Sequence, residues 1–107
     1  MASHRLRKCR AYINLLLSQD RVQGEALLVT ANHDQVDCIT EVVRNILRLP
    51  VGKKTKRLIA EYAKLLHALA DFALSQKKRL QLIHTHSQKI LEVLHSVKIR
   101  LAAVLHP

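Results

Sequence analysis

One apolar stripe in the middle of the chain restricts the fold more than any other feature of the sequence. Its side chains recur at alternating spacings of four and three residues, at Leu58, Tyr62, Leu65, Leu69 and Phe72. Side chains spaced in this way lie on one face of an α-helix. Further apolar residues widen the stripe, as is typical of a helix packed in a globular core. We therefore predict a long helix over residues 55–74.

Weaker stripes with the same period predict helices on both sides of this segment. Ser3 is expected to cap the first helix. Asn32, with Gln35 three residues later, matches a capping box at the start of another. Pro50 and Gly52 are expected to end that helix. The predicted helices outside the central segment cover about 3–19, 22–30, 32–49 and 76–105.

The last of these segments is compatible with two arrangements. A seven-residue apolar pattern allows one helix over 76–105. The stretch "HTHS" (84–87) contains weak helix formers and a natural cap, Ser87, which favours two helices. We prefer two helices, over about 76–84 and 88–105.

Turn-forming residues are scarce along the whole chain. Gly and Pro number two each, which is too few for a turn-rich β-sandwich or barrel. A chain of 107 residues is the usual size of one domain. The sequence therefore predicts a single helical domain over residues 1–107, all-α, built as a compact bundle of five or six short amphipathic helices.

The chain is strongly basic, and its positive charge is uneven. Lys and Arg number 18 against 8 Asp and Glu, which gives a formal net charge of +10. Residues 1–52 hold 7 basic and 5 acidic side chains, whereas residues 53–107 hold 11 and 3. Such an excess indicates a polyanionic partner, with nucleic acid first and an anionic membrane surface second.

Eleven of the basic residues form three clusters, each at or near a predicted helix start. Backbone N–H groups there have no partner within the helix, and Lys and Arg beside them make sites for phosphate. For each cluster alone, a solvated charged face is the alternative. We expect the three clusters together to form one continuous positive surface. The clusters are Lys53, Lys54, Lys56 and Arg57; Lys77, Lys78 and Arg79; and Arg5, Arg7, Lys8 and Arg10.

Several other classes of function are not expected. A helix-turn-helix would open its recognition helix with the carboxylates of Asp34, Asp37 and Glu41, which phosphates repel. Three aromatic residues do not make a stacking platform for single strands. The chain lacks a Walker loop and H-E-x-x-H, so a non-enzymatic role is expected. No Cys accompanies the His84/His86 pair, and no metal or cofactor is expected.

The two cysteines, Cys9 and Cys38, form no CxxC pair and are expected to be separate reduced thiols. This expectation favours an intracellular location, in the cytosol or the nucleus. The sequence shows no signal-peptide pattern and no apolar run of about 18 residues. Neither secretion nor a membrane span is therefore expected.

Residues 26–83 contain an ordered series of short segments: "ALLVTAN", "DQV", "EVVRNIL", "KKTKRLIAEY", "LHALAD" and "SQKKRLQLI". In this order they resemble small basic open reading frames carried by Maverick/Polinton-type and adintovirus-like DNA elements of animals. The resemblance covers about half of the chain and includes no catalytic signature. It implies a virus-like genome context and a virion or DNA-packaging role, and it assigns no functional residue.

The function expected from the sequence is non-enzymatic binding of DNA or another polyanion through phosphate contacts. A binder with about 6–10 such contacts loses roughly 10³–10⁵ in affinity between 50 and 200 mM salt. The alternative is a helical protein–protein interaction module, such as a death-fold-like adaptor or a virion scaffold component. Its charged patches would then pair with an acidic protein partner. A homo-oligomer is compatible with both.

Overall fold

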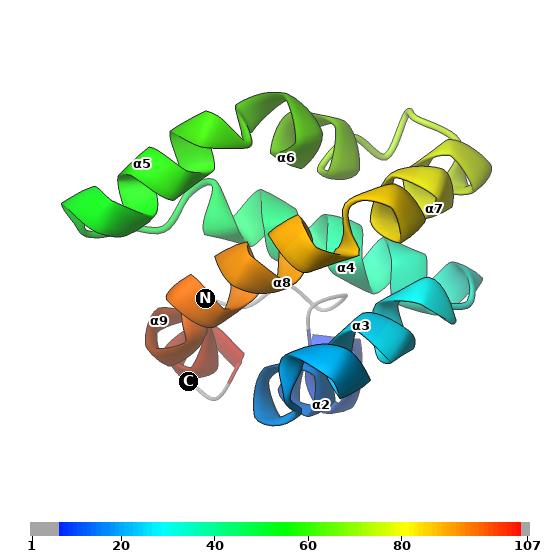
Figure 1. Ribbon diagram of the computed structural model, residues 1–107, viewed down its shortest axis with the longest axis horizontal. Helices are drawn as coiled ribbons and strands as arrows, with labels where there is room; N and C mark the ends of the chain where they lie inside the picture. The colour runs from blue at the N-terminus through cyan, green and yellow to red at the C-terminus, as the bar shows by residue number, and fades with distance from the viewer. Residues whose placement is uncertain (1–6, 106–107) are drawn as a thin grey trace.

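The computed structural model describes the backbone of residues 7–105 and the side chains of residues 7–103. Eight α-helices account for most of this part of the chain. This part contains no strand, so the all-α prediction is confirmed, although the helices exceed the five or six expected. Figure 1 shows their arrangement. The helices are α2 (Arg10–Ser18), α3 (Arg21–Val29), α4 (His33–Ile46), α5 (Lys53–Glu61), α6 (Ala63–Leu69), α7 (Gln76–Thr85), α8 (Ser87–Ser96) and α9 (Lys98–Leu105).

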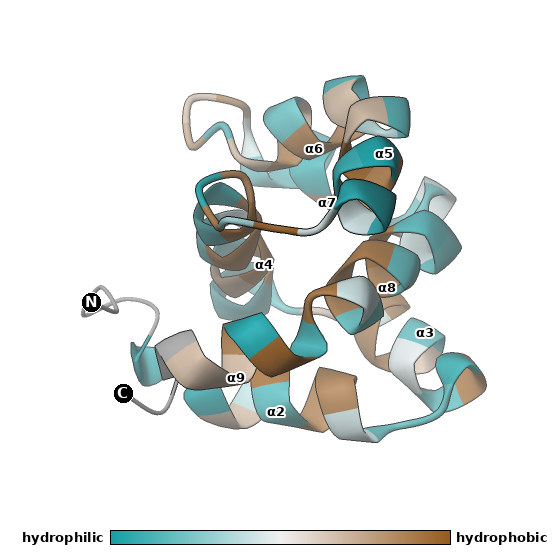
Figure 2. Ribbon diagram, turned by 90° about the vertical axis from the view of Figure 1, so that its left-hand side faces the viewer, coloured by the Kyte–Doolittle hydropathy of each residue, from teal (hydrophilic) through white to brown (hydrophobic). Residues whose placement is uncertain are grey.

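Helix α8 occupies the centre of the bundle. It packs against α2, α3, α5 and α7, and its apolar residues Ile90, Leu91, Val93 and Leu94 are buried. In Figure 1, α5 and α6 lie above α8, while α2, α3 and α9 lie below it. The outer turns of α5 are hydrophilic in Figure 2, as expected for a helix that covers the bundle from outside. The helices enclose one core built almost entirely of Leu, Ile and Val.

Two of the predicted helices are each divided into two shorter ones. The helix expected over 55–74 bends at Tyr62, whose φ of −104° and ψ of 22° lie outside the helical range. The bend lets α5 pack against α8 while α6 packs against α4 and α7, so one apolar stripe covers two different surfaces. The stretch over 76–105 breaks at His86, as we preferred, and breaks again at Val97.

Helix starts follow the capping pattern of the sequence at two positions. Asn32 and Gln35 form the predicted capping box, and the Ser75 hydroxyl accepts a hydrogen bond from the Lys78 N–H at 3.2 Å. Ser87 behaves differently, because its hydroxyl donates a hydrogen bond to Glu25 of α3 at 3.1 Å instead of capping α8. The cap predicted at Ser3 lies outside the described residues.

Cys9 and Cys38 form a disulfide, which makes the expectation of two reduced thiols wrong. The residues are 29 positions apart in sequence, and their Cα atoms lie 5.5 Å apart. Cys9 is the N-cap of α2, and α2 packs directly against α4, where Cys38 lies. Helix packing therefore brings together two thiols that show no local pairing motif. The argument for an intracellular location no longer holds, because it depended on reduced thiols.

Candidate polyanion-binding surface

Helix α5 begins with four cations that all face solvent. Gly52 is its N-cap, with extended backbone and no side chain to bond the first N–H groups. Lys53, Lys54, Lys56 and Arg57 are exposed, and the first turn contains no acidic residue. The half-buried Leu58 lies against the core and anchors the helix. Packing thus leaves the basic face of α5 outward.

The charges of this α5 cluster are not compensated within the described part of the chain. None of the four side chains forms an ion pair with an acidic residue among residues 7–103. The positive end of a helix dipole raises the free energy of cations placed beside it. A bound anion would lower that free energy, and it would also accept hydrogen bonds from the open N–H groups.

The second predicted cluster, on α7, is only partly available to a ligand. Lys77 and Lys78 are exposed in the first turn, but Arg79 is 3% exposed. Arg79 was predicted as a phosphate contact, and the structure contradicts this because the side chain points into the bundle. Its Nη1 donates to Asp37 Oδ1 at 2.9 Å and to Thr40 Oγ1 at 2.7 Å.

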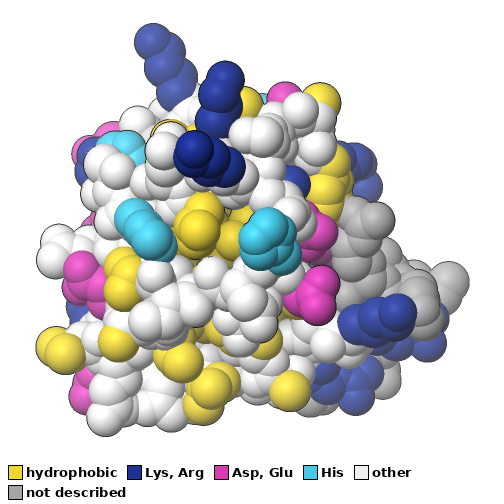
Figure 3. Space-filling model, turned by 90° about the vertical axis from the view of Figure 1, so that its right-hand side faces the viewer, with side chains coloured by type: hydrophobic (Ala, Val, Ile, Leu, Met, Phe, Trp, Pro, Cys, Tyr) yellow, Lys and Arg dark blue, Asp and Glu magenta, His cyan; other side chains and the backbone are white. Residues whose placement is uncertain are grey.

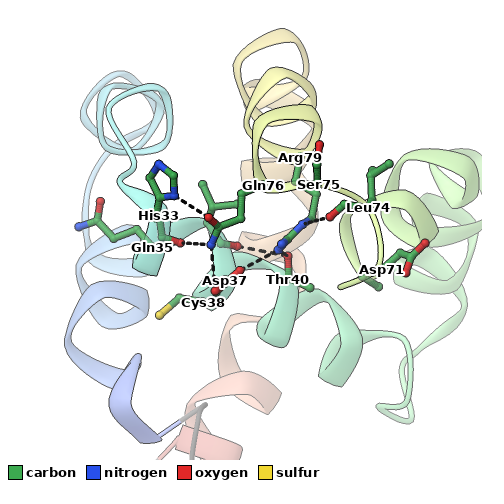
Figure 4. A network of polar contacts seen from close by, with 12 residues as sticks. His33, Gln35, Asp37, Cys38, Thr40, Asp71, Leu74, Ser75, Gln76 and Arg79 are labelled. Carbon is green, nitrogen blue, oxygen red and sulfur yellow. Dashed lines mark hydrogen bonds and ion pairs between the residues drawn. The ribbon is translucent and has the colours of Figure 1, made fainter.

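A polar network surrounds the buried guanidinium, as Figure 4 shows. Arg79 Nε donates to the Leu74 carbonyl at 2.9 Å, and the guanidinium carbon lies 5.4 Å from the centre of the Phe72 ring. Gln76 Nε2 donates to the second oxygen of Asp37 at 3.1 Å and to the His33 carbonyl at 3.3 Å. The network joins the start of α7 to α4, so the role of Arg79 is structural.

The third cluster begins just before α2. Arg7 and Lys8 are exposed. Arg10 is half-buried, and its enclosed Nε has no hydrogen-bond partner in the described part of the chain. Arg5 lies outside the described residues. Of the three described residues of this cluster, two are therefore open to solvent.

The clusters do not form the continuous positive surface that we predicted. In Figure 1, α5 begins at the left edge of the molecule and α7 begins at the right edge, while α2 lies at the bottom. The molecule is about 30 Å across, with extents of 31 × 29 × 28 Å. Figure 3 shows lysine and arginine side chains in separate groups on one face, with acidic, histidine and uncharged side chains between them. The α5 cluster therefore stands as a site by itself.

A cavity of about 500 Å³ lies beside the α5 cluster, and sequence reasoning did not find it. Lys54 and Arg57 line it from α5, and Arg21 lines it from the start of α3. His95, near the end of α8, also lines it. The signal that could have pointed to this cavity is the shared face of Lys54 and Arg57, which are three residues apart on one helix. The contributions of α3 and α8 are set by packing alone.

The histidine in this cavity has an unusual environment. Burial, followed by the nearby charges of Lys98 and Arg21, lowers the pKa of His95 below its usual value. Its enclosed Nε2 has no hydrogen-bond partner among the described residues. Leaving a buried polar atom without a partner costs about 1–3 kcal/mol.

A second cavity, of about 630 Å³, is lined by residues of α5, α6, α7 and α8 and shares Glu61 with the first cavity. The Tyr62 hydroxyl, at the bend between α5 and α6, donates to Glu92 at 2.7 Å. This hydrogen bond, followed by burial, raises the pKa of Tyr62 to about 12. The Lys89 ammonium lies 5.6 Å from the centre of the Tyr62 ring. These contacts hold α5 against α8 and fix the far end of the first cavity.

Other possible sites are not formed by the described residues. Between residues 7 and 103, no three His, Cys, Asp or Glu side chains gather closely enough to bind a metal ion. None of the helices described has both the length and the apolar character needed to cross a bilayer. The chain matches no protein-family model, no curated protein and no solved structure.

Proposed function

We propose that this protein binds nucleic acid or a similar polyanion without catalysis, through phosphate contacts made by the α5 cluster. One observation carries the proposal: Lys53, Lys54, Lys56 and Arg57 share one helix start, face solvent and pair with no carboxylate of residues 7–103. Contacts of this kind supply affinity and carry no sequence information. Condensation or packaging of a genome in a virus-like element remains part of the proposal, on the basis of the resemblance of residues 26–83.

The separation of the clusters changes the expected strength of binding. Four phosphate contacts on α5 predict a slope of log K against log salt concentration of about −3.6 for duplex DNA. Affinity should then fall about two orders of magnitude between 50 and 200 mM salt. This is a weaker dependence than one continuous surface of about 6–10 contacts would produce.

A salt titration of fluorescence anisotropy, on two duplexes of unrelated sequence, tests the proposal. Both duplexes should bind with the same slope. Changing Lys53→Gln together with Lys56→Gln should reduce its magnitude by about 2. The matched control is Lys77→Gln with Lys78→Gln, which removes the same charge from the opposite side of the molecule and should leave the slope unchanged. A slope that the α5 changes do not alter, or a strong preference for one duplex, would contradict the proposal.

The alternative, a helical protein-interaction module, is favoured by a different surface. Leu15 of α2 is 42% exposed, and it lines a groove of about 440 Å³ with Ala26 and Leu27 of α3. Val22, at the start of α3, is 79% exposed. If this surface is the functional one, the protein should form oligomers that persist at high salt and should not shift duplex DNA. Sedimentation of the wild type and of Leu15→Asp at 50 mM and 1 M salt separates the two functions.

A further inference from the structure

The cavity between α3, α5 and α8 has a size and a polarity that indicate a small ligand. Its volume of about 500 Å³ falls within the range of about 300–1,000 Å³ that is usual for small-molecule sites. Its charged lining comes from three helices: Arg21, Lys54, Arg57, Glu61 and Glu92, with His95.

The positive and negative side chains occupy different ends of this cavity. On α5, Lys54, Arg57 and Glu61 follow one another at spacings of three and four, so they lie along one face with the cations first. Helix α8 runs in the opposite direction beside α5 (Figure 1). Glu92 therefore lies level with the end of α5, where it accepts the hydrogen bond of Tyr62.

The cationic end is completed by residues that are distant in sequence. His95 lies one turn beyond Glu92 on α8, toward the start of α5. Arg21 is close enough to His95 for its charge to act on the imidazole. Three cations thus gather at one end of the cavity, and two carboxylates lie at the other.

We propose that this cavity binds a nucleoside monophosphate whose base carries an exocyclic amino group. Three cations at one end suit a phosphate monoester, which carries nearly two negative charges at neutral pH. Carboxylates only accept hydrogen bonds, so the other end of the ligand must donate them, as the amino group of cytosine does. The inference deepens the proposed function, on which it rests for the choice of a nucleotide. The mononucleotide can be free or can be the 5′ end of a strand.

Isothermal titration calorimetry at low salt with dCMP and dUMP tests the proposal. The two bases differ at C4, which carries an amino group in cytosine and a carbonyl in uracil, and at N3, which is an acceptor in cytosine and carries one N–H donor in uracil. We expect dCMP to bind about tenfold more tightly than dUMP. Deoxycytidine, which lacks the phosphate, should show no measurable binding.

Two variants that each remove one exposed cation separate a built site from general surface charge. Lys54→Ala removes a cavity-lining cation and should weaken dCMP binding about tenfold or more. Arg48→Ala removes an exposed cation that follows α4, belongs to none of the basic clusters and does not line the cavity, and it should leave dCMP binding within about twofold. Both positions are exposed, so neither change should disturb folding.

The proposal is overturned if dCMP does not bind, if dUMP binds equally well, or if the two variants lose affinity equally.

If dCMP binds as expected, a single strand that begins with cytosine shows whether the ligand is a free nucleotide or the 5′ end of a strand. If the strand binds more tightly with a 5′-phosphate than without one, and Lys54→Ala removes this difference, the ligand is a strand end. If dCMP binds tightly but the 5′-phosphate of the strand makes no difference, the ligand is a free nucleotide. Duplex binding with the predicted salt slope but without dCMP binding would leave the proposed function standing and remove this site. The reverse result would keep the site and remove the duplex function.

Discussion

Asp37 and Arg79 form an ion pair whose two partners differ in burial. The Arg79 side chain is 4% exposed, whereas the Asp37 side chain is 35% exposed. Removal of Asp37 would leave a buried charge without its partner, while removal of Arg79 would leave a carboxylate that water can reach. The two halves of the pair should therefore respond differently to substitution.

We expect Asp37→Ala to lower the free energy of unfolding by about 3 kcal/mol or more. Arg79→Met should cost less, because methionine fills much of the same space and leaves no buried charge. Urea unfolding of both single variants and of the double variant measures the difference. If Arg79→Met is the more damaging change, the Phe72 and Leu74 contacts of Arg79 outweigh its ion pair.

His95 should make the stability depend on pH below neutrality. Its pKa is lowered in the folded state, so the unfolded chain binds a proton more readily. Stability associated with His95 is complete above its ordinary pKa of about 6.5 and is lost as the pH falls toward the folded pKa. The unfolding free energies of the wild type and of His95→Gln, measured by chemical unfolding across pH 5–8, should converge as the pH falls. Parallel curves would show that His95 does not contribute.

At the scale of elements, the contact between α3 and α8 depends on a glycine. Gly24 has no positive φ, so its backbone conformation is open to any residue. A Cβ atom built on Gly24 would lie 3.1 Å from Leu91 Cδ2, which is closer than an ordinary van der Waals contact. Glycine therefore allows close approach of the two helices, at some cost in helix propensity.

Substitutions at Gly24 should change stability according to side-chain size. Gly24→Ala should lie within about 1 kcal/mol of the wild type, because the gain in helix propensity offsets the tight contact. Gly24→Val should cost about 1–3 kcal/mol, since the larger side chain would press on the buried Leu91. Ala26→Val, on the exposed side of α3, controls for the helix propensity of valine. Equal losses for the two valine variants would show that the contact with Leu91 is unimportant.

At the scale of the whole molecule, the disulfide between Cys9 and Cys38 ties the start of α2 to α4. It closes a loop over 29 positions of sequence, and a cross-link of this span stabilises a fold by about 3–4 kcal/mol, mainly by restricting the unfolded chain. Such a bond persists in an oxidising compartment or on a virion surface.

The double variant Cys9→Ala and Cys38→Ala should lose about 3–4 kcal/mol of unfolding free energy. Addition of dithiothreitol should lower the denaturation midpoint of the wild type and leave that of the variant unchanged. Thiol titration of the denatured, unreduced protein provides an independent readout. Two free thiols in that titration would contradict the bond.

The sequence could predict the helices and several of their starts, because these depend on neighbours within a few residues. The capping pair Asn32 and Gln35 acts through hydrogen bonds within the first turn of α4, and this prediction is confirmed. The Ser75 hydroxyl caps α7 by the same kind of local hydrogen bond. The exposure of Lys53, Lys54 and Lys56 was also predictable, since burial of an unpaired lysine is costly and lysine side chains stay in water.

The sequence could not predict which residues of α7 and of the start of α8 face inward. Arg79, Ile83 and Ser87 lie four positions apart and are all buried, but only one of them is apolar. Hydrophobic periodicity cannot detect a buried face of this kind, because Arg79 and Ser87 are satisfied by Asp37 and Glu25 from other helices. The cavity beside α5 escaped prediction for the same reason, since Arg21 and His95 reach it from separate elements.

The amino-acid sequence alone thus determined the all-helical class, the positive charge and the basic start of α5, because each depends on composition or on local spacing. Tertiary structure alone decided the disulfide, the burial of Arg79, the bend at Tyr62 and the separation of the basic clusters. Each of these depends on which helix faces which, and long-range contacts set that arrangement without leaving a local pattern in the sequence.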